Sequence, residues 1–482
     1  MLKNFNKPII NKREWQSMTQ YPYTAAAAVC IIAPEDAYCD YALVVGSATT
    51  AAIYDYNNDG YELATNPALA GTFGAGTCGV YSPWGIPYIT AGGSGNILTV
   101  NSVAFNITGL IIGTTLVMTS GTQVGFTTTV TGVLTDGGNG MITIYLKDAL
   151  PAAVASGDTF KTLSGSYYVV NGGTKVANNF KAFDLGTRNW TVGLNNTALP
   201  NLTSESAMTT MYKHGEYMAE GKASGGTSTT MTSGRTTTTE ADQAGSAAPN
   251  WTANQWKGYQ VTITKGLFRQ TRVITANTNI ELTVSPAFTF TPDNTCTYKI
   301  ESDEDSIYLI SSAVTLYKYS ISTNLWAVLG PTVARAGTPG GGSTLDSPTN
   351  TKRFEWSDEN DIRNGRYLYS LRGGGSILID RYDIVANKWE VVNTKTIETF
   401  ATGTSSVMVH GDWYIKSSAT GHRLFRYNVV DNVMYPFSTI AINEGTAVYG
   451  QKIHTKRIKD TDLIFLYSIA SNQTAVYRTL LY

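Results

Sequence analysis

The chain is poor in charge. Only 15% of its 482 residues are Asp, Glu, Lys or Arg, against about 25% in an ordinary soluble domain. The two signs nearly balance, with a net charge of −1 and a pI near 6.5. Neither nucleic acid nor an anionic membrane is therefore favoured as a partner on electrostatic grounds.

Metal-ligating side chains are also scarce. The four cysteines have no Cys-x-x-Cys spacing, so buried free thiols are favoured over a zinc site or a disulfide framework, although Cys30 and Cys39 could approach across a hairpin. The four histidines lie far apart, and a zinc site would need them to converge. We predict no metal and no cofactor. These residues are Cys30, Cys39, Cys78, Cys296, His214, His410, His422 and His454.

Long apolar runs and catalytic motifs are missing too. The first residues, MLKNFNKPIINKREW, contain no secretory apolar region, and the stretch Ala25–Ala33 is far shorter than the ~20 residues that span a bilayer. We therefore expect a soluble protein made in the cytoplasm. No GxSxG, P-loop, HExxH or Cys/His nucleophile pattern occurs. The sequence predicts no catalytic residues.

The abundant residue types are those that favour β-strands and tight turns. The 46 glycines, 29 tyrosines and many threonines suit short strands joined by tight turns. One phrase recurs five times: an alternating strand, a turn with Asn or Gly, and an aromatic that opens a second strand. Each copy predicts a hairpin whose aromatic packs on a neighbouring sheet. The copies are Ile53–Tyr61, Phe180–Trp190, Leu316–Trp326, Ile379–Trp389 and Leu424–Tyr435.

A further strand precedes most copies, and together they predict sheets repeated radially, as in a propeller. These upstream strands are Tyr41–Val45, Tyr167–Val170, Ile307–Ile310, Tyr367–Leu371 and Trp413–Lys416.

The two ends of the chain complement each other. Residues 462–482 contain two strands, Leu463–Tyr467 and Thr474–Leu480, but no aromatic partner strand. That strand is found at the other terminus, where Asn11–Trp15 reads like Ala386–Trp389. The sequence thus predicts an all-β, six-bladed propeller closed by an N-terminal strand. Its six blade-anchor aromatics are Trp15, Tyr61, Trp190, Trp326, Trp389 and Tyr435.

Two gaps between anchors are far longer than a blade of ~40–50 residues. The surplus segments, Leu110–Lys161 and Trp256–Ile300, share an order of strands, Gly turns and a closing Pro/Asp segment. We interpret them as two copies of one β-module inserted at the same hairpin of consecutive blades. Gly221–Asn250 and Arg335–Asn350 are expected to be a linker and a long loop. The predicted division is propeller 1–94, first module 95–165, propeller 166–221, linker plus second module 222–300 and propeller 301–482.

Three groups of residues could carry chemistry. Asp55, Asn57, Asp59 and Gly60 match the first half of a calcium loop, but Asn66 stands where a bidentate Glu is needed, so a β-turn is favoured. The acid clusters Glu301–Asp305 and Asp358–Asp361 could cleave glycosides, although acids also collect in solvated loops. Three tryptophans are candidate sugar platforms, interface residues or, for Trp251, buried packing. They are Trp84, Trp251 and Trp356.

The aromatic-Asn-x-Trp phrase resembles the kelch type of β-propeller. Gly172-Gly173 and Gly373–Gly375 match the kelch glycine pair, which blades one, three and five lack. The inserted module, closing near PDNTCTYKI, resembles small β-domains of predicted virion proteins from tailed phages, whose tail nozzle and collar proteins are propellers with such insertions. This resemblance implies assembly rather than turnover of a substrate.

We therefore expect a non-enzymatic structural component of a phage virion, in the tail nozzle, collar or fibre attachment. Its partners would be other phage structural proteins, and it would form a homo-oligomer in a symmetric ring, with no nucleic acid or membrane contact required. The alternative is a receptor-binding or polysaccharide-depolymerising tail protein that uses a host glycan. A cellular kelch-type scaffold is the third reading.

Overall fold

Every regular element that the structure describes is a β-strand. Within this part of the chain no helix has the length and apolarity needed for a membrane crossing. The computed structural model describes residues 16–19, 30–32, 40–46, 51–64, 73–74, 76–83, 85–101, 110–136, 140–191, 194–203, 206–211, 217–234, 251, 253–254, 256–257, 259–301, 305–311, 314–341, 343–347, 367–384, 386–392, 398–409, 412–417, 423–429, 431–439, 453–457, 463–469 and 476–480.

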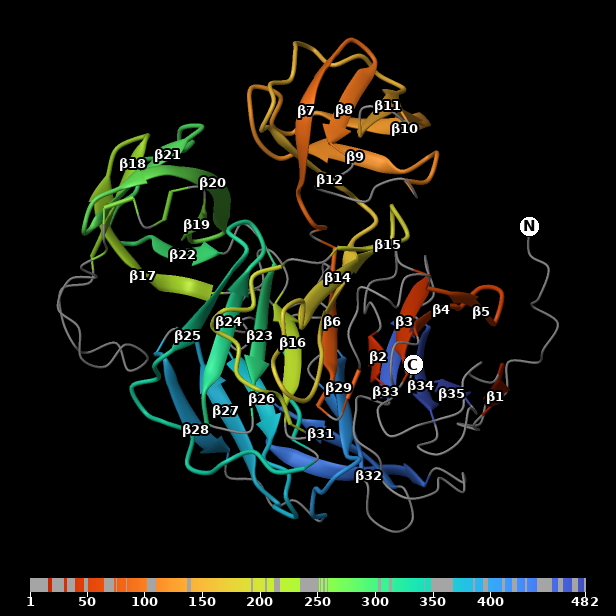
Figure 1. Ribbon diagram of the computed structural model, residues 1–482. Helices are drawn as coiled ribbons and strands as arrows, with labels where there is room; N and C mark the ends of the chain where they lie inside the picture. The colour runs from red at the N-terminus through yellow and green to blue at the C-terminus, as the bar shows by residue number, and fades with distance from the viewer. Residues whose placement is uncertain are drawn as a thin grey trace.

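The strands form antiparallel sheets and two closed barrels (Figure 1). In chain order, the first sheet contains β2 (Cys30–Ile32), β3 (Tyr41–Val45), β4 (Ala51–Asp55) and β5 (Gly60–Leu63). The second contains β6 (Cys78–Ser82), β13 (Ser166–Val170), β14 (Phe180–Asp184) and β15 (Asn189–Thr191). The third contains β16 (Ala207–Met211), β23 (Ser306–Ile310), β24 (Leu316–Ser320) and β25 (Leu325–Leu329).

The C-terminal part continues the pattern. A three-stranded sheet contains β26 (Tyr367–Leu371), β27 (Ile379–Asp383) and β28 (Lys388–Val392). The next contains β29 (Ser405–Val409), β30 (Asp412–Lys416), β31 (Arg423–Asn428) and β32 (Val433–Thr439). The last contains β33 (Ile453–Arg457), β34 (Ile464–Ile469), β35 (Val476–Leu480) and the N-terminal β1 (Gln16–Met18).

Each sheet shares an apolar core with the next. Phe183 and Trp190 of the second sheet pack with Leu43 of the first, and equivalent cores join each later pair. Tyr467 of the last sheet packs with Tyr54 of the first. The edge strand β6 contacts β2 and β16, and β33 contacts β2 and β29. The arrangement of sheets is therefore propeller-like.

The N-terminal strand pairs with the last strand of the chain, as expected, but it consists of later residues than the sequence predicted. Gln16 pairs with Arg478 and Met18 with Val476 in an antiparallel ladder between β1 and β35. The sequence placed this strand on residues 11–15. Trp15, the anchor expected there, lies outside the described residues.

The recurring hairpin has a definite geometry. Across its turn an aromatic pairs with the residue seven positions on: Tyr54 with Tyr61, Phe183 with Trp190, Tyr319 with Trp326 and Tyr382 with Trp389. The residue two before each second aromatic has a positive φ. In these four copies the residue is Asp59, Arg188, Asn324 and Asn387, and in the fifth copy it is Asn432. Asn and Asp predominate because their side chains tolerate the left-handed region. The tyrosine hydroxyl donates to that side chain in the pairs Tyr54–Asp59, Tyr319–Asn324, Tyr382–Asn387 and Tyr427–Asn432.

The anchor predicted at Tyr435 is wrong by one residue. Tyr427 pairs across its turn with Met434, which is 6% exposed and packs between the fourth and fifth sheets, whereas Tyr435 is 46% exposed. Side chains alternate along a strand, so a shift of one position moves a residue to the other face. A methionine therefore occupies the position that an aromatic fills in the other turns.

This turn geometry predicts an order of effects at Asn387. Asn387→Ala is expected to cost about 2 kcal/mol of unfolding free energy, because alanine at positive φ is strained and the Tyr382 hydroxyl loses its acceptor, now 2.6 Å away. Asn387→Gly should cost about 1 kcal/mol, since glycine adopts positive φ without strain but leaves the Tyr382 hydroxyl without its acceptor. Asn387→Asp keeps the acceptor and tolerates positive φ, as Asp59 does, but loses the amide N–H that donates to the Gly330 carbonyl at 2.9 Å. It should still cost least, because Ala and Gly lose both side-chain hydrogen bonds. Denaturant unfolding of the three variants checks the order; equal losses for Ala and Gly would contradict it.

Two six-stranded barrels are spliced into the second and third sheets. The first contains β7 (Tyr88–Ser94), β8 (Ile97–Asn101), β9 (Thr115–Met118), β10 (Thr127–Asp136), β11 (Met141–Leu146) and β12 (Thr159–Thr162). The second contains β17 (Tyr217–Gly226), β18 (Thr230–Ser233), β19 (Gln260–Lys265), β20 (Phe268–Asn277), β21 (Glu281–Ser285) and β22 (Thr297–Glu301). Counting strands within each barrel, both close in the order 1-2-5-4-3-6, so they are two copies of one topology.

Both barrels leave the sheets at the same place. Ser82 pairs with Ser166 where the first barrel departs, and Met211 pairs with Ser306 where the second departs. Each barrel therefore replaces the turn between the innermost strand and the next strand of its sheet. In Figure 1 the barrels stand above the sheets as separate lobes.

Three predicted boundaries need correction. The first barrel begins at Tyr88 rather than residue 95, because Gly92 and Gly93, assigned to the propeller, lie inside a bulged strand of the barrel. Residues 221–233, expected in a linker, pair as β17 and β18. Within the expected loop 335–350, Asp346 pairs with Tyr369 and adds an inner bridge to the three-stranded sheet.

Candidate interaction surface

The far end of the second barrel carries an exposed apolar turn. Strand β22 returns to the sheet, and its antiparallel partner β19 runs away from it, so the β19–β20 hairpin turns at the end remote from the sheets. Lys265 pairs with Phe268, which leaves Gly266 and Leu267 as a two-residue turn. Gly266 has a φ of +57°, as the first position of a type II′ turn requires. Leu267 is fully exposed and Phe268 is 73% exposed.

The first barrel exposes apolar side chains on its outer wall. Ile142 and Ile144 of β11 are buried in the barrel core, so the alternating Thr143 and Tyr145 face outward. Tyr145 pairs with Ile97 on β8, and Leu134 on β10 pairs with Thr143. Ile97, Leu134 and Tyr145 are 40%, 55% and 39% exposed. Exposed apolar groups gathered in this way are typical of contact surfaces.

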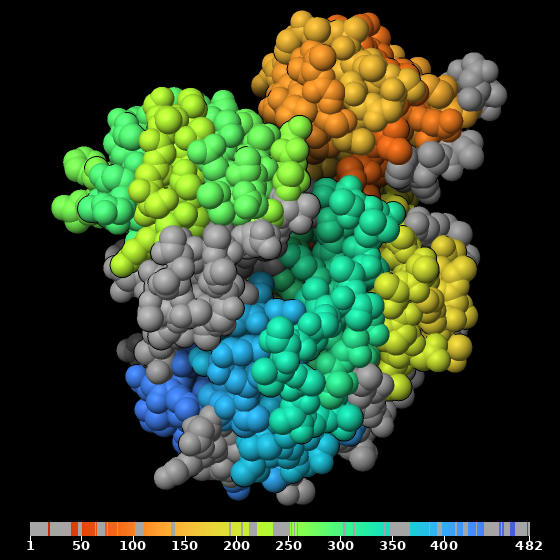
Figure 2. Space-filling model, turned by 90° about the vertical axis from the view of Figure 1, so that its left-hand side faces the viewer, coloured from red at the N-terminus to blue at the C-terminus, as the bar shows by residue number. Residues whose placement is uncertain are grey.

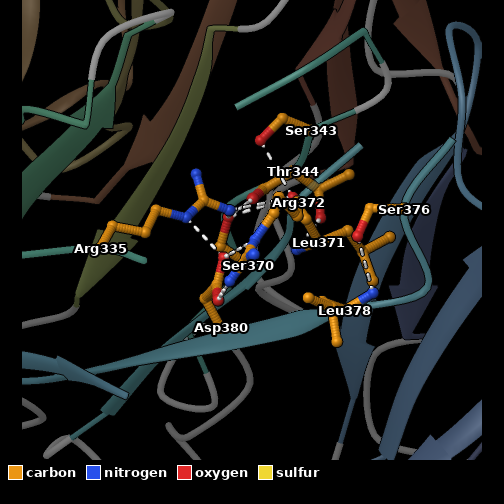
Figure 3. A network of polar contacts seen from close by, with 9 residues as sticks. All are labelled: Arg335, Ser343, Thr344, Ser370, Leu371, Arg372, Ser376, Leu378 and Asp380. Carbon is orange, nitrogen blue, oxygen red and sulfur yellow. Dashed lines mark hydrogen bonds and ion pairs between the residues drawn. The ribbon is translucent and has the colours of Figure 1, made fainter. Parts of the chain in front are cut away.

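Where the third and fourth sheets meet, a charged cluster is buried. Figure 3 shows the guanidinium groups of Arg335 and Arg372 turned toward Asp380. Arg335 Nε lies 2.6 Å from Asp380 Oδ2, and Arg372 Nη2 lies 2.5 Å from Oδ1. Arg335 also donates to the Ser370 hydroxyl at 2.9 Å and lies over the Trp389 ring. Burial lowers the pKa of the Arg335 guanidinium, and Asp380 opposes that shift. The cluster ties the segment after β25 to β26 and β27.

Two further ionisable groups are buried among aromatics. Lys181 is fully buried, its amine has no hydrogen-bond partner among the described residues, and it lies 4.5 Å from the centre of the Phe73 ring. Burial lowers the pKa of Lys181 to about 7. His454 is stacked on Tyr467, and burial lowers the pKa of its imidazole to about 3. Both groups belong to the cores between sheets and not to an open surface.

The candidate calcium loop is a hairpin turn. Asp55 Oδ1 accepts the backbone N–H groups of Asn57 and Asn58, at 2.8 and 3.2 Å. Asp59 accepts the Tyr54 hydroxyl and the backbone N–H of Thr19. Both carboxylates thus serve the turn itself. Asn66 lies outside the described residues, and the described residues contain no group of three or more His, Cys, Asp or Glu side chains that could hold a metal.

Of the two candidate acid clusters, the structure describes only Glu301 and Asp305. Glu301 is buried beside Lys299 and accepts the Thr262 hydroxyl. Asp305 is buried and accepts the Ser82 hydroxyl. Glu301 is thus held within the second barrel, and Asp305 links the third sheet to Ser82 of the second sheet. Residues 302–304 and 358–361 lie outside the described part of the chain.

Other candidates are placed as follows. Trp251 is buried in the second barrel beside Trp256, as the packing alternative predicted. Cys78 and Cys296 are buried and form no disulfide with another described residue, in line with the prediction. The remaining candidates have no described side chain: Cys30, Cys39, Trp84, His214, Trp356, His410 and His422.

Sequence reasoning missed both apolar surfaces and the buried charged cluster. The tight turn could have been found from Gly266, because a glycine between two strands marks a two-residue hairpin whose next residue points into solvent. The cluster had no local signal, since Arg335 and Asp380 are 45 residues apart in the chain.

No protein-family model matches the chain, and no curated protein matches its sequence. Solved structures that resemble it include YjhT, with a TM-score of 0.38 and 8% identity over 96% of this chain and 96% of that chain. U3-55K has a TM-score of 0.34 and 7% identity over 97% of this chain and 98% of that chain. A chain of the mitotic checkpoint complex has a TM-score of 0.33 and 7% identity, covering 100% and 96%. Because these scores are low, the propeller-like arrangement rests on the pairing and packing of this chain's own sheets.

Proposed function

We propose that this chain is a non-enzymatic structural component of a phage virion, in the tail nozzle, collar or fibre attachment, where it binds neighbouring virion proteins. The observation that carries the assembly role is the pair of barrels with one topology, inserted at the same turn of adjacent sheets. A rigid body that presents two lobes suits a part that holds neighbours in fixed positions. The virion setting rests on the resemblance of the inserted modules to those of tailed phages.

The body of this component is, in our proposal, a six-bladed kelch-like propeller closed by its N-terminal strand. Support comes from the shared core between each sheet and the next, including the last and the first. The pairing of β1 with β35 supports closure through the N-terminal strand, because it joins the two ends of the chain in one sheet. Closure of a ring protects sheet edges that would otherwise remain open.

Light scattering coupled to size-exclusion chromatography, with negative-stain imaging, tests the assembly role. We expect ring-shaped particles of several copies, or incorporation of the purified chain into phage tail fractions. Variants in which residues 83–165 or 212–305 are replaced by an Asn-Gly turn should retain the sheets, as judged by circular dichroism, and lose assembly. A stable monomer that binds or cleaves host polysaccharide would contradict the proposal and favour receptor binding.

A further inference from the structure

The last sheet packs on the first at what we call the closing junction. Its described core consists of Ala42, Val44, Ala52, Tyr54, Tyr56 and Tyr467. In each other sheet the two outer strands are joined by a hairpin, but the outer strand of the last sheet is β1, which is attached to β35 only by backbone pairing (Figure 1). The last sheet can therefore separate from the first without breaking any hairpin, provided that β1 leaves β35.

Two polar contacts also belong to the closing junction. The Asp59 carboxylate accepts the backbone N–H of Thr19, directly after β1, at 2.9 Å, so it attaches the end of β1 to the first sheet. Across the junction, Lys456 of β33 lies 3.1 Å from Asp40, which precedes β3. If the two sheets separate, β1 can thus stay with the first sheet, while the pair between Lys456 and Asp40 breaks.

His454 lies in this junction among aromatic rings. It is 4% exposed and stacks on Tyr467 of its own sheet, with ring centres 5.1 Å apart and 6° between the planes. Tyr56, which follows β4 in the first sheet, meets it edge-on with ring centres 5.7 Å apart. Neither Nδ1 nor Nε2 of the imidazole has a hydrogen-bond partner in the part of the chain that the structure describes. The imidazole therefore joins the two sheets through ring contacts alone.

The surroundings favour the neutral imidazole. A protonated imidazole has two N–H donors, and both would be buried here without an acceptor. Lys456 lies two positions on and so on the same face of β33, and its ammonium is 5.7 Å from the centre of the Tyr56 ring. A second positive charge would therefore enter beside the first. Attraction to the tyrosine rings is too small to replace the hydrogen bonds that water offers two charged donors.

Burial accordingly lowers the pKa of His454 to about 3. The other titratable groups of the junction, among the described residues, are Asp40, Tyr54, Tyr56, Asp59, Tyr61, Lys456 and Tyr467.

We propose that protonation of His454 opens the closing junction, so that mild acid separates the last sheet from the first while the other junctions stay closed. This inference does not rest on the proposed virion function. In the opened molecule the imidazole meets water and its pKa returns to the ordinary value of 6.5, so at lower pH the opened state binds a proton that the closed state excludes. The closed junction has its full stability above pH 6.5 and loses stability as the pH falls toward 3. Between pH 7 and pH 5 the equilibrium constant for opening should rise about 25-fold.

Acid acts in the opposite direction where the fourth sheet meets the fifth. Asp346 joins these sheets, because its carboxylate accepts the Trp413 indole N–H at 2.8 Å. Burial raises the pKa of Asp346 to about 6. The closed state there takes up a proton before the opened state does, so this contact becomes more stable as the pH falls from 7 to 5.

The junctions earlier in the chain change little over this range. Between the first and second sheets, Lys181 is already half protonated at pH 7, and opening there should rise only about twofold by pH 5. The third and fourth sheets, teal and light blue in Figure 2, form one continuous surface, and the buried pair between Arg335 and Asp380 lies where they meet. Acid therefore weakens the closing junction most.

A thiol placed in the closing junction measures its opening. The full chain carries Ala42→Cys, because Ala42 is fully buried in the core of that junction. The natural Cys78, buried between the second and third sheets, is the internal control. A pyridyl disulfide that reacts with thiols both in acid and at neutral pH modifies each thiol when its junction opens, and peptide mass spectrometry gives the two rates separately. The same measurement on His454→Phe, which keeps an aromatic ring but takes up no proton, cancels the contributions of Asp40 and Asp59.

We expect the rate at position 42, relative to that in His454→Phe at the same pH, to rise about 25-fold from pH 7 to pH 5, and the corresponding ratio at Cys78 to stay constant. An unchanged ratio at position 42 would overturn the proposal. So would an equal rise at Cys78, because acid would then unfold the whole molecule. If His454→Phe did not fold, the rate at position 42 divided by the rate at Cys78 in the chain with native His454 should itself rise about 25-fold, and a constant quotient would overturn the proposal.

Discussion

Replacing Asp380 with alanine is expected to lower the free energy of unfolding by about 3–5 kcal/mol, because removing one member of a buried ion pair leaves charge without a partner. Here two guanidinium groups lose their common carboxylate, and the Arg335 side chain has no exposure to water. Denaturant unfolding followed by fluorescence measures the loss. Trp389 lies under Arg335 and should report it directly.

The matched control is Glu62→Ala. Glu62 faces Arg188 at 4.0 Å, but its side chain is largely exposed, and exposed pairs contribute about 0–1 kcal/mol. Asp380→Asn should fall between the two, since an amide oxygen still accepts hydrogen bonds but carries no charge. If Asp380→Ala lowered the free energy of unfolding no more than Glu62→Ala, the charged cluster would not stabilise the attachment of the segment after β25 to β26 and β27.

Lys181→Met is expected to have a large effect in the opposite direction, stabilising the protein by about 4 kcal/mol at pH 7. Burial lowers the pKa of Lys181 from 10.5 to about 7 in the folded state. Each pKa unit corresponds to about 1.4 kcal/mol. Between pH 7 and 10.5 the unfolded chain holds a proton that the folded chain has lost, so wild-type stability rises with pH. Methionine fills the space between Phe73 and Trp190 without a charge.

The pH dependence separates this cause from better packing. The advantage of Lys181→Met over the wild type should shrink from about 4 kcal/mol at pH 7 to about 0.4 kcal/mol at pH 10.5, because the folded lysine is then neutral and half of the unfolded lysines are neutral as well. Paired unfolding curves across that range measure the difference, and other titrating groups cancel. A constant advantage at every pH would show that Lys181 carries no unpaired charge in the core.

Much of the fold could be predicted from local patterns. The strands Tyr41–Val45 and Tyr367–Leu371 occur as the sequence predicted, because their alternation and β-branched or aromatic residues act locally. The repeated turn was visible for the same reason, since Asn at positive φ and an aromatic two residues later leave a signature in sequence. Two similar surplus segments were enough to predict one module inserted twice at one hairpin.

What could not be predicted depends on register and on distant contacts. Tyr435 was chosen over Met434 because an aromatic stands at this point in other copies, but pairing with Tyr427 decides which face is buried. The Gly- and Thr-rich stretch at 221–233 reads as a linker until its pairing with β21 and β22 is known. The exposed apolar wall of the first barrel became visible only when cross-strand pairing placed Ile97 beside Tyr145.

The pairing of β1 with β35 also bears on how the protein is made. Residues 16–18 leave the ribosome long before their strand partners at 476–478 have been translated. Until then the first strand has no partner strand to pair with, while sheets built from neighbouring segments can form as those segments emerge. This pairing must wait until residue 476 has been translated, and a chain truncated before that residue would leave a strand edge open to aggregation and to proteases.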